Sequence, residues 1–164
     1  MTMKTREIYF RNFIFGVDDS LVSTVGLLSG IASAGVERET IFLTGIVLIF
    51  VEAFSMAAGS FLSEASAEEY SARTNISQSR SFSASIIMFG SYFVAGFIPL
   101  FPYVITEVPV AFPLSVALSI AALFLLGAWS GKLSKAGIIR GAFRMAIVGG
   151  IAIALGVVVG VVLG

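Results

Sequence analysis

Polar and charged positions divide this chain of 164 residues into five long apolar runs. Each run is close to the roughly 20 residues that a helix needs to cross the hydrocarbon core of a bilayer. Because an unpaired backbone group in lipid costs several kcal/mol, each run is predicted to be an α-helix. The pattern therefore predicts an all-α, polytopic membrane protein, a single domain over residues 1–164. Its five transmembrane spans are expected at about 13–35, 41–62, 83–104, 111–131 and 143–163.

Polar stretches and prolines mark the connections between the runs. The longest connection is predicted over Ser63–Phe82. Pro99 and Pro102 are expected to kink or end the third span, because proline lacks the backbone N–H that a helix needs. Pro109 and Pro113 flank the start of the fourth span.

Basic residues predict the orientation in the membrane. In a five-span topology, nine of the ten basic residues fall on the side of the N-terminus, and only Arg38 falls on the other. The nine are Lys4, Arg6, Arg11, Arg73, Arg80, Lys132, Lys135, Arg140 and Arg144. Since cytoplasmic loops are enriched in Lys and Arg, the N-terminus is predicted to be cytoplasmic and the C-terminus outside or luminal.

The composition narrows the possible chemistry. The chain is 57% apolar and 12% charged, has zero formal net charge, and contains neither Cys nor His. Disulfides, Cys/His zinc sites and Ser-His-Asp triads are thereby excluded. A membrane phosphotransferase is not expected either, because the basic residues that would hold a phosphate lie only in the connections. We therefore expect no enzyme, no resident cofactor and no nucleic-acid partner.

Acidic residues within the apolar runs are the candidates for function. Glu52 lies in the middle of the second run, where a carboxylate costs about 2.5–3.5 kcal/mol on insertion scales. Asp18 and Asp19 lie in the first run, and their side chains point about 100° apart on a helix, so both cannot line one narrow path equally well. Asp18 has a second interpretation, as a residue that reaches to water or caps the helix.

A stripe on the second run continues from Glu52 toward the N-terminal side of the membrane. It passes through Met56, one helical turn later, and then through Glu64 and Glu68. Carboxylates and a thioether together suit a borderline divalent cation such as ferrous iron or manganese. Taken alone, a methionine such as Met56 is more often a packing residue than a ligand. Glu64, Glu68 and Glu69 are most simply explained as a solvated helix end, with ion capture as the alternative.

Small residues recur at helical spacing in two of the runs. Gly26 and Gly30 lie in the first run, and Gly156, Gly160 and Gly164 end the fifth. Such spacing lets helix backbones approach closely in lipid. Contacts within one bundle and contacts between subunits would give the same pattern.

Two motifs resemble those of the vacuolar iron transporter family, and the resemblance covers essentially the whole chain. They are the stretch from Phe15-Gly16 to Asp18-Asp19, and Ser55-Met56 with Gly59. The resemblance implies five spans, a homodimer with its ion path between the two first helices, and Asp19 and Met56 as pathway residues. It also implies export of ferrous iron or manganese from the cytosol in exchange for protons, with the metal as substrate.

The chain departs from the family pattern in three places. Ser20 replaces the glycine that follows the family's aspartate, and Leu48 stands where iron-transporting members often carry a glutamate. The large Glu-rich cytoplasmic domain of the best-studied iron members is replaced by the short Ser63–Phe82 connection. The role of Glu52 therefore rests on its helical face alone.

A second hypothesis is a small dimeric, proton-coupled exporter of organic cations. In that case Asp19 and Glu52 would bind protons and cargo, and some of the fifteen Phe side chains would stack on the cargo. A comparison of metal sensitivity with drug sensitivity in cells that lack the protein would separate the two hypotheses.

Overall fold

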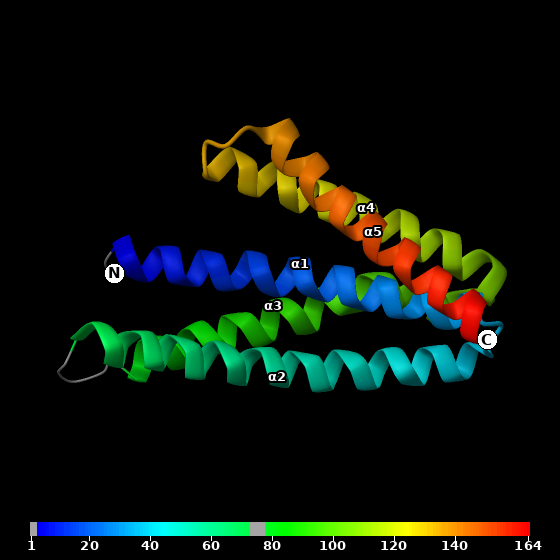
Figure 1. Ribbon diagram of the computed structural model, residues 1–164, viewed down its shortest axis with the longest axis horizontal. Coiled ribbons are helices and arrows are strands. Elements are labelled where there is room, and N and C mark those ends of the chain that lie inside the picture. The colour runs from blue at the N-terminus through cyan, green and yellow to red at the C-terminus, as the bar shows by residue number, and fades with distance from the viewer. Residues whose placement is uncertain (1–2, 73–77) are drawn as a thin grey trace.

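The computed structural model describes residues 3–72 and 78–164, and in this part the protein is a bundle of five α-helices without strands (Figure 1). The helices are α1 (Met3–Ser33), α2 (Arg38–Ala72), α3 (Gln78–Ile105), α4 (Val108–Leu133) and α5 (Ile138–Leu163). Each contains a segment long and apolar enough to cross a membrane. Successive helices run in opposite directions, so the N- and C-termini lie at opposite ends of the bundle. The predicted all-α membrane fold is confirmed.

Two helices extend well beyond the apolar runs that predicted them. The first helix begins at Met3, and its early turns pack against the bundle, since the ring of Phe10 lies 5.6 Å from that of Trp129 in α4. The second helix continues to Ala72, through residues that were predicted to connect two spans. Alanine and glutamate are frequent in this stretch, and both favour helix without needing an apolar environment. Hydropathy locates the membrane-spanning part of a helix but not its polar ends.

Pro99 and Pro102 lie inside α3 and do not end the helix at once. Helix α3 passes through Pro99 and Pro102 and ends at Ile105. The carbonyl oxygen of Pro99 has a partner in the neighbouring helix, since Ser115 of α4 donates a hydrogen bond of 2.6 Å to it. Pro109 lies in the first turn of α4, where its missing N–H has no partner to lose.

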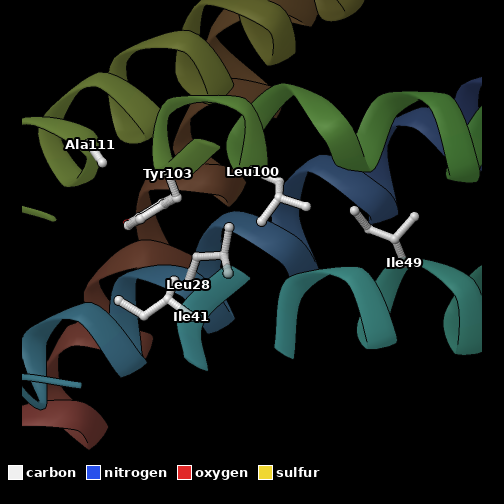
Figure 2. Close-up of a cluster of buried hydrophobic side chains, with 6 residues drawn as sticks. All are labelled: Leu28, Ile41, Ile49, Leu100, Tyr103 and Ala111. Atoms are coloured by element: carbon white, nitrogen blue, oxygen red, sulfur yellow. The ribbon is translucent and has the colours of Figure 1, made fainter. Parts of the chain in front are cut away.

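The other helices pack on two sides of α1. Helix α3 packs against both α1 and α2, while α5 packs against α1 and α4. A buried apolar cluster joins four of the helices near the end that carries the α1–α2 connection (Figure 2). Its members are Leu28, Ile41, Ile49, Leu100, Tyr103 and Ala111. A second cluster, around Leu21, Ala95 and Leu123, joins α1, α3 and α4. These clusters fix the position of α1 relative to its neighbours.

The glycine spacing is used within the chain, between α1 and α5. A Cβ atom built on Gly30 would lie 2.9 Å from the carbonyl oxygen of Gly156, and one built on Gly26 would lie 3.3 Å from that of Ala152. Gly160 likewise abuts the backbone of Gly30. The two backbones are therefore in direct contact, which only residues without side chains permit. The alternative that the sequence left open is resolved for this stripe: it joins two helices of one subunit.

Candidate functional site

Asp19 and Glu52 come from different helices, and the charge of Glu52 acts on the carboxylate of Asp19. Asp19 projects from the middle of α1 and Glu52 from the middle of α2, and both side chains are half-buried. Two like charges inside a membrane repel one another unless a cation or a proton lies between them. A metal site at these two carboxylates stays a prediction.

A buried tyrosine from α3 completes the surroundings of this acidic pair. Tyr92 has no exposed surface, and its charge interactions include both Asp19 and Glu52. Its hydroxyl shares a hydrogen bond of 2.7 Å with Ser23 of α1, and its backbone oxygen accepts one of 2.6 Å from Ser20. The sequence reasoning did not single out Tyr92. Its signal was a polar tip on an aromatic side chain in an apolar run, which usually finds a partner when buried.

Met56 and Glu64 line one cavity of about 610 Å³ between α1, α2 and α3. Its lining residues on α1 and α2 belong to the first half of α1 and the second half of α2, toward the end of the bundle that carries the N-terminus. Its walls offer a carboxylate, hydroxyl and amide oxygens, and thioether sulfurs. The complete lining is Arg11, Asn12, Phe15, Ser55, Met56, Gly59, Ser60, Ser63, Glu64 and Met88. Hard and soft donors thus face the same space, as a borderline cation requires.

Met88 of α3 is a second thioether in this cavity, which the sequence reasoning missed. It is only 4% exposed, and it reaches the cavity beside Gly16 of α1, where a Cβ atom would lie 3.2 Å from its sulfur. The same Cβ atom would lie closer still to the hydroxyl of Ser91, so the glycine makes room chiefly for Ser91. Nothing in the sequence around Met88 distinguishes it from a packing residue, because only the crossing of α1 and α3 brings it opposite Met56.

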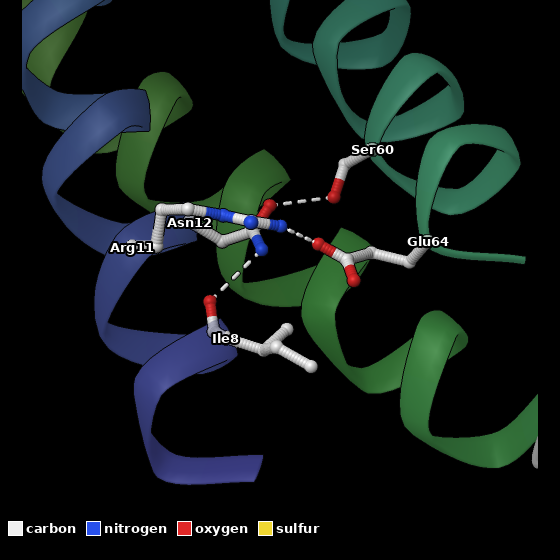
Figure 3. A network of polar contacts seen from close by, with 5 residues as sticks. All are labelled: Ile8, Arg11, Asn12, Ser60 and Glu64. Carbon is white, nitrogen blue, oxygen red and sulfur yellow. Dashed lines mark hydrogen bonds and ion pairs between the residues drawn. The ribbon is translucent and has the colours of Figure 1, made fainter. Parts of the chain in front are cut away.

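Glu64 is buried, and the prediction that it belongs to a solvated helix end is wrong. It is 8% exposed, and its carboxylate forms an ion pair with Arg11 across α1 and α2 (Figure 3). Beside this pair, Ser60 donates a hydrogen bond of 2.5 Å to the side-chain oxygen of Asn12. Glu69 is exposed, as a solvated helix end predicts. The side chain of Glu68 lies outside the described residues.

Asp18 faces a different part of the molecule from Asp19. It lines a smaller cavity of about 320 Å³ between α1, α4 and α5, together with Arg144, whose charge acts on it. One of its carboxylate oxygens is buried and has no hydrogen-bond partner among the residues that the structure describes. The two neighbouring aspartates therefore serve separate environments, as the 100° between adjacent side chains requires.

One copy of the chain offers few charged ligands for a cation. Across residues 3–72 and 78–164, no three Asp, Glu, Cys or His side chains cluster as a metal site would need. Asp19 and Glu52 do not belong to the lining of the Met56 cavity, whose donors are the Glu64 carboxylate, the sulfurs of Met56 and Met88, and hydroxyl and amide oxygens. Water or a second copy of the chain would have to complete the coordination of a divalent ion there.

A comparison with known families gives one match. The sequence model described as the VIT family matches residues 10–80 and 67–161, which together extend over nearly the whole chain and include all five helices. No curated protein matches the chain.

Proposed function

The chain belongs to the VIT family of membrane transporters, and we propose that it exports ferrous iron or manganese from the cytosol in exchange for protons. It is an integral membrane protein, with five helices suited to crossing a bilayer. Family membership supports metal-ion transport and argues against an enzyme. The identity of the ion, the direction of transport and the coupling to protons are the parts that we propose.

The observation that carries the proposal is that two carboxylates, Asp19 and Glu52, lie within membrane-length stretches of two helices and act on one another through their charges. Each carboxylate is costly in a membrane span, and placing two of them together adds their mutual repulsion. A divalent cation between the two carboxylates would offset both the cost of burying them and their mutual repulsion. Such an arrangement is expected where a cation passes and has no evident value for packing.

The thioethers support a borderline metal as cargo. Met56 lies one helical turn from Glu52, and Met88 faces the same cavity from α3. Sulfur ligands favour iron and other transition metals over magnesium and calcium. The absence of Cys and His keeps the binding weak, which a transported ion needs in order to leave again.

Proton exchange follows from the same groups. A carboxylate that has released its metal ion can take up a proton, and the protonated pair no longer repels itself. Binding metal from one side and protons from the other would therefore couple the two flows. Asp19 and Glu52 are the groups to which we assign both tasks.

The orientation and the oligomeric state complete the proposal. The distribution of basic residues supports a cytoplasmic N-terminus, which places the cavity of Met56 and Glu64 on the cytoplasmic side. A homodimer would bring the acidic pairs of two copies to a shared path between the two first helices, and would supply the ligands that one copy lacks. The resemblance of the Phe15–Asp19 and Ser55–Gly59 motifs to the family supports that arrangement.

Transport into proteoliposomes tests the proposal. Fe²⁺, Mn²⁺, Co²⁺ and Zn²⁺ are offered separately to the wild type and to Asp19→Ala, Glu52→Ala and Met56→Ala, with and without a pH gradient. Glu39→Gln is the matched control, because Glu39 is an exposed carboxylate at the opposite end of α2. We expect Fe²⁺ or Mn²⁺ flux that a pH gradient drives and that the three variants reduce.

Two results would contradict the proposal. Equal flux in the wild type and all variants would remove the acidic pair from the path. Metal flux that is absent, together with proton-driven movement of an organic cation such as ethidium, would favour the exporter of organic cations instead.

A further inference from the structure

The ion pair between Arg11 and Glu64 (Figure 3) joins two residues that line the cavity of Met56. Both residues belong to the cavity lining, so the guanidinium occupies space beside the carboxylate that an incoming cation would need. Family membership does not account for this pair, and the acidic pair deeper in the membrane does not use it. Its position invites the question of what it does when metal is present.

Glu64 supplies the carboxylate in the lining of this cavity. Met56, Ser60 and Glu64 follow one another at intervals of four residues along α2, and all three line the cavity. Glu52 lies one helical turn before Met56 and is not part of that lining. Glu64 is therefore the carboxylate that a cation in the cavity would meet.

The two partners of the ion pair differ strongly in burial. The side chain of Glu64 is 10% exposed, whereas that of Arg11 is 68% exposed. A buried carboxylate must keep a positive partner, but an exposed arginine can swing into water at little loss. Arg11 is therefore the mobile partner, and Glu64 is the fixed one.

The neighbouring hydrogen bond keeps the helices together without Arg11. Asn12 is 3% exposed, its amide nitrogen donates to the Ile8 oxygen at 2.9 Å, and its side-chain oxygen accepts from Ser60 at 2.5 Å. These bonds hold α1 against α2 whether or not the ion pair is formed. Release of Arg11 would thus free the Glu64 carboxylate within the cavity without breaking these bonds.

We propose that Glu64 is an outer binding site for the divalent cation and that Arg11 is a tethered competitor for it. In the absence of metal the guanidinium occupies the carboxylate, and an arriving divalent ion replaces it. A singly charged ion competes poorly with a guanidinium on a carboxylate, so the exchange favours divalent cargo. This inference deepens the proposed function and rests on it for the identity of the cargo.

Binding of Mn²⁺, measured by the electron paramagnetic resonance signal of the free ion, tests the exchange on the full chain in nanodiscs. Asp19→Asn and Glu52→Gln are introduced into every protein, so that the inner carboxylates do not contribute. In this background we expect Arg11→Gln to tighten Mn²⁺ binding about tenfold, because a competing ion pair of partly buried geometry is removed. Arg11→Lys keeps the positive charge and should bind within about twofold of the parent.

Glu64→Gln supplies the decisive comparison. It should abolish the binding that Arg11→Gln tightens, and the double variant Arg11→Gln with Glu64→Gln should match Glu64→Gln alone. If Arg11→Gln binds Mn²⁺ no more tightly than the parent, or if Glu64→Gln binds it equally well, the exchange is wrong. A shared loss of thermal stability in both variants without a change in Mn²⁺ binding would likewise overturn it and leave a structural clamp.

The result of the Mn²⁺ binding experiment does not depend on whether the protein transports metal. Flux in proteoliposomes of the wild type decides the proposed function, because that protein retains Asp19 and Glu52. Binding in the background that lacks both carboxylates decides the outer site. A transporter without the exchange, and an outer site on a protein that moves no metal, therefore give different pairs of results.

Discussion

Helix α1 has two faces that solve different problems, and the contrast explains much of the molecule. The face toward α2 and α3 carries Asp19, on which the charge of Glu52 acts, and Ser23, which shares a hydrogen bond with Tyr92. The face toward α5 carries glycines, whose backbones touch those of the opposite helix. Contact of α1 with α5 is about as extensive as its contact with α3, and both exceed its contact with α2.

The two faces of α1 therefore have different roles: one holds helices together, and the other offers polar groups to a cation. In lipid the hydrophobic effect does not draw helices together, so close backbone packing is what holds α1 on α5. The α1–α2 face is polar and encloses a cavity, so it gives up packing in favour of groups that a cation can use. The glycine face between α1 and α5 should therefore tolerate little change in side-chain volume. The polar face between α1 and α2 should tolerate little change in the chemical groups of its side chains.

The largest expected effect concerns the neighbouring aspartates. Asp19→Asn keeps the shape and removes the charge, and should lower metal flux about 100-fold, because the loss of a direct ligand should at least match the 10–100-fold cost of losing an outer-sphere partner. Asp18→Asn is the matched control and should keep flux within about threefold, since Asp18 lines another cavity. Flux of the two variants in proteoliposomes measures both. A larger loss in Asp18→Asn would reverse the assignment of the two faces.

The next effect concerns the glycine seam. Gly30→Ala places a methyl group against the Gly156 backbone and should lower the free energy of unfolding by about 1–3 kcal/mol, as overpacking does. Gly90→Ala is the control, because nothing lies within 4 Å of the added methyl group and alanine favours helix by about 0.5–1 kcal/mol. Unfolding in detergent, followed by circular dichroism, compares them. Equal stability of the two variants would show that the seam can shift.

A smaller effect should distinguish the sulfur of Met56 from its bulk. Met56→Leu preserves volume but removes the thioether, and should lower Fe²⁺ flux about tenfold relative to Mn²⁺, because manganese depends less on sulfur. Met145→Leu is the matched control, since Met145 packs beside the cluster of Leu21 and Leu123, away from the cavity of Met56. Competition between the two ions in one transport assay gives the ratio. An unchanged ratio would return Met56 to the role of a packing residue.

The smallest effect concerns the tyrosine behind the acidic pair. Tyr92→Phe removes the hydrogen bond to Ser23 and should lower the free energy of unfolding by about 1 kcal/mol. Ser83→Ala removes an exposed hydrogen bond of 2.9 Å to the Ser79 oxygen and should have nearly no effect. Thermal unfolding in detergent measures both changes. A neutral Tyr92→Phe would mean that the hydroxyl contributes nothing to the fit of α1 on α3.

The fold and part of the site could be predicted from the sequence. Five apolar runs specify five helices, because lipid leaves no other way to satisfy the backbone. The stripes that contain Asp19, and Glu52 with Met56, follow from helical geometry, and their place in a metal path stays a prediction. Charged residues within apolar runs are rare, so they can be recognised from the sequence alone.

The burial of Glu64 and the place of Met88 could not be predicted in this way. Glu64 follows a polar stretch, and only the early start of α1 places Arg11 beside it and covers it. Met88 resembles any apolar residue until α3 crosses α1 at Gly16. Both depend on which residues meet between helices that are far apart along the chain.

The sequence by itself determined the number of helices, their membrane character and the residues predicted to bind a cation. The tertiary structure alone decided which faces meet: glycines with glycines between α1 and α5, and arginine with glutamate between α1 and α2 in the lining of the cavity. The physical reason is that lipid and protein interior are equally apolar. Hydropathy therefore separates membrane from water and carries little information about which side of a helix faces its neighbours.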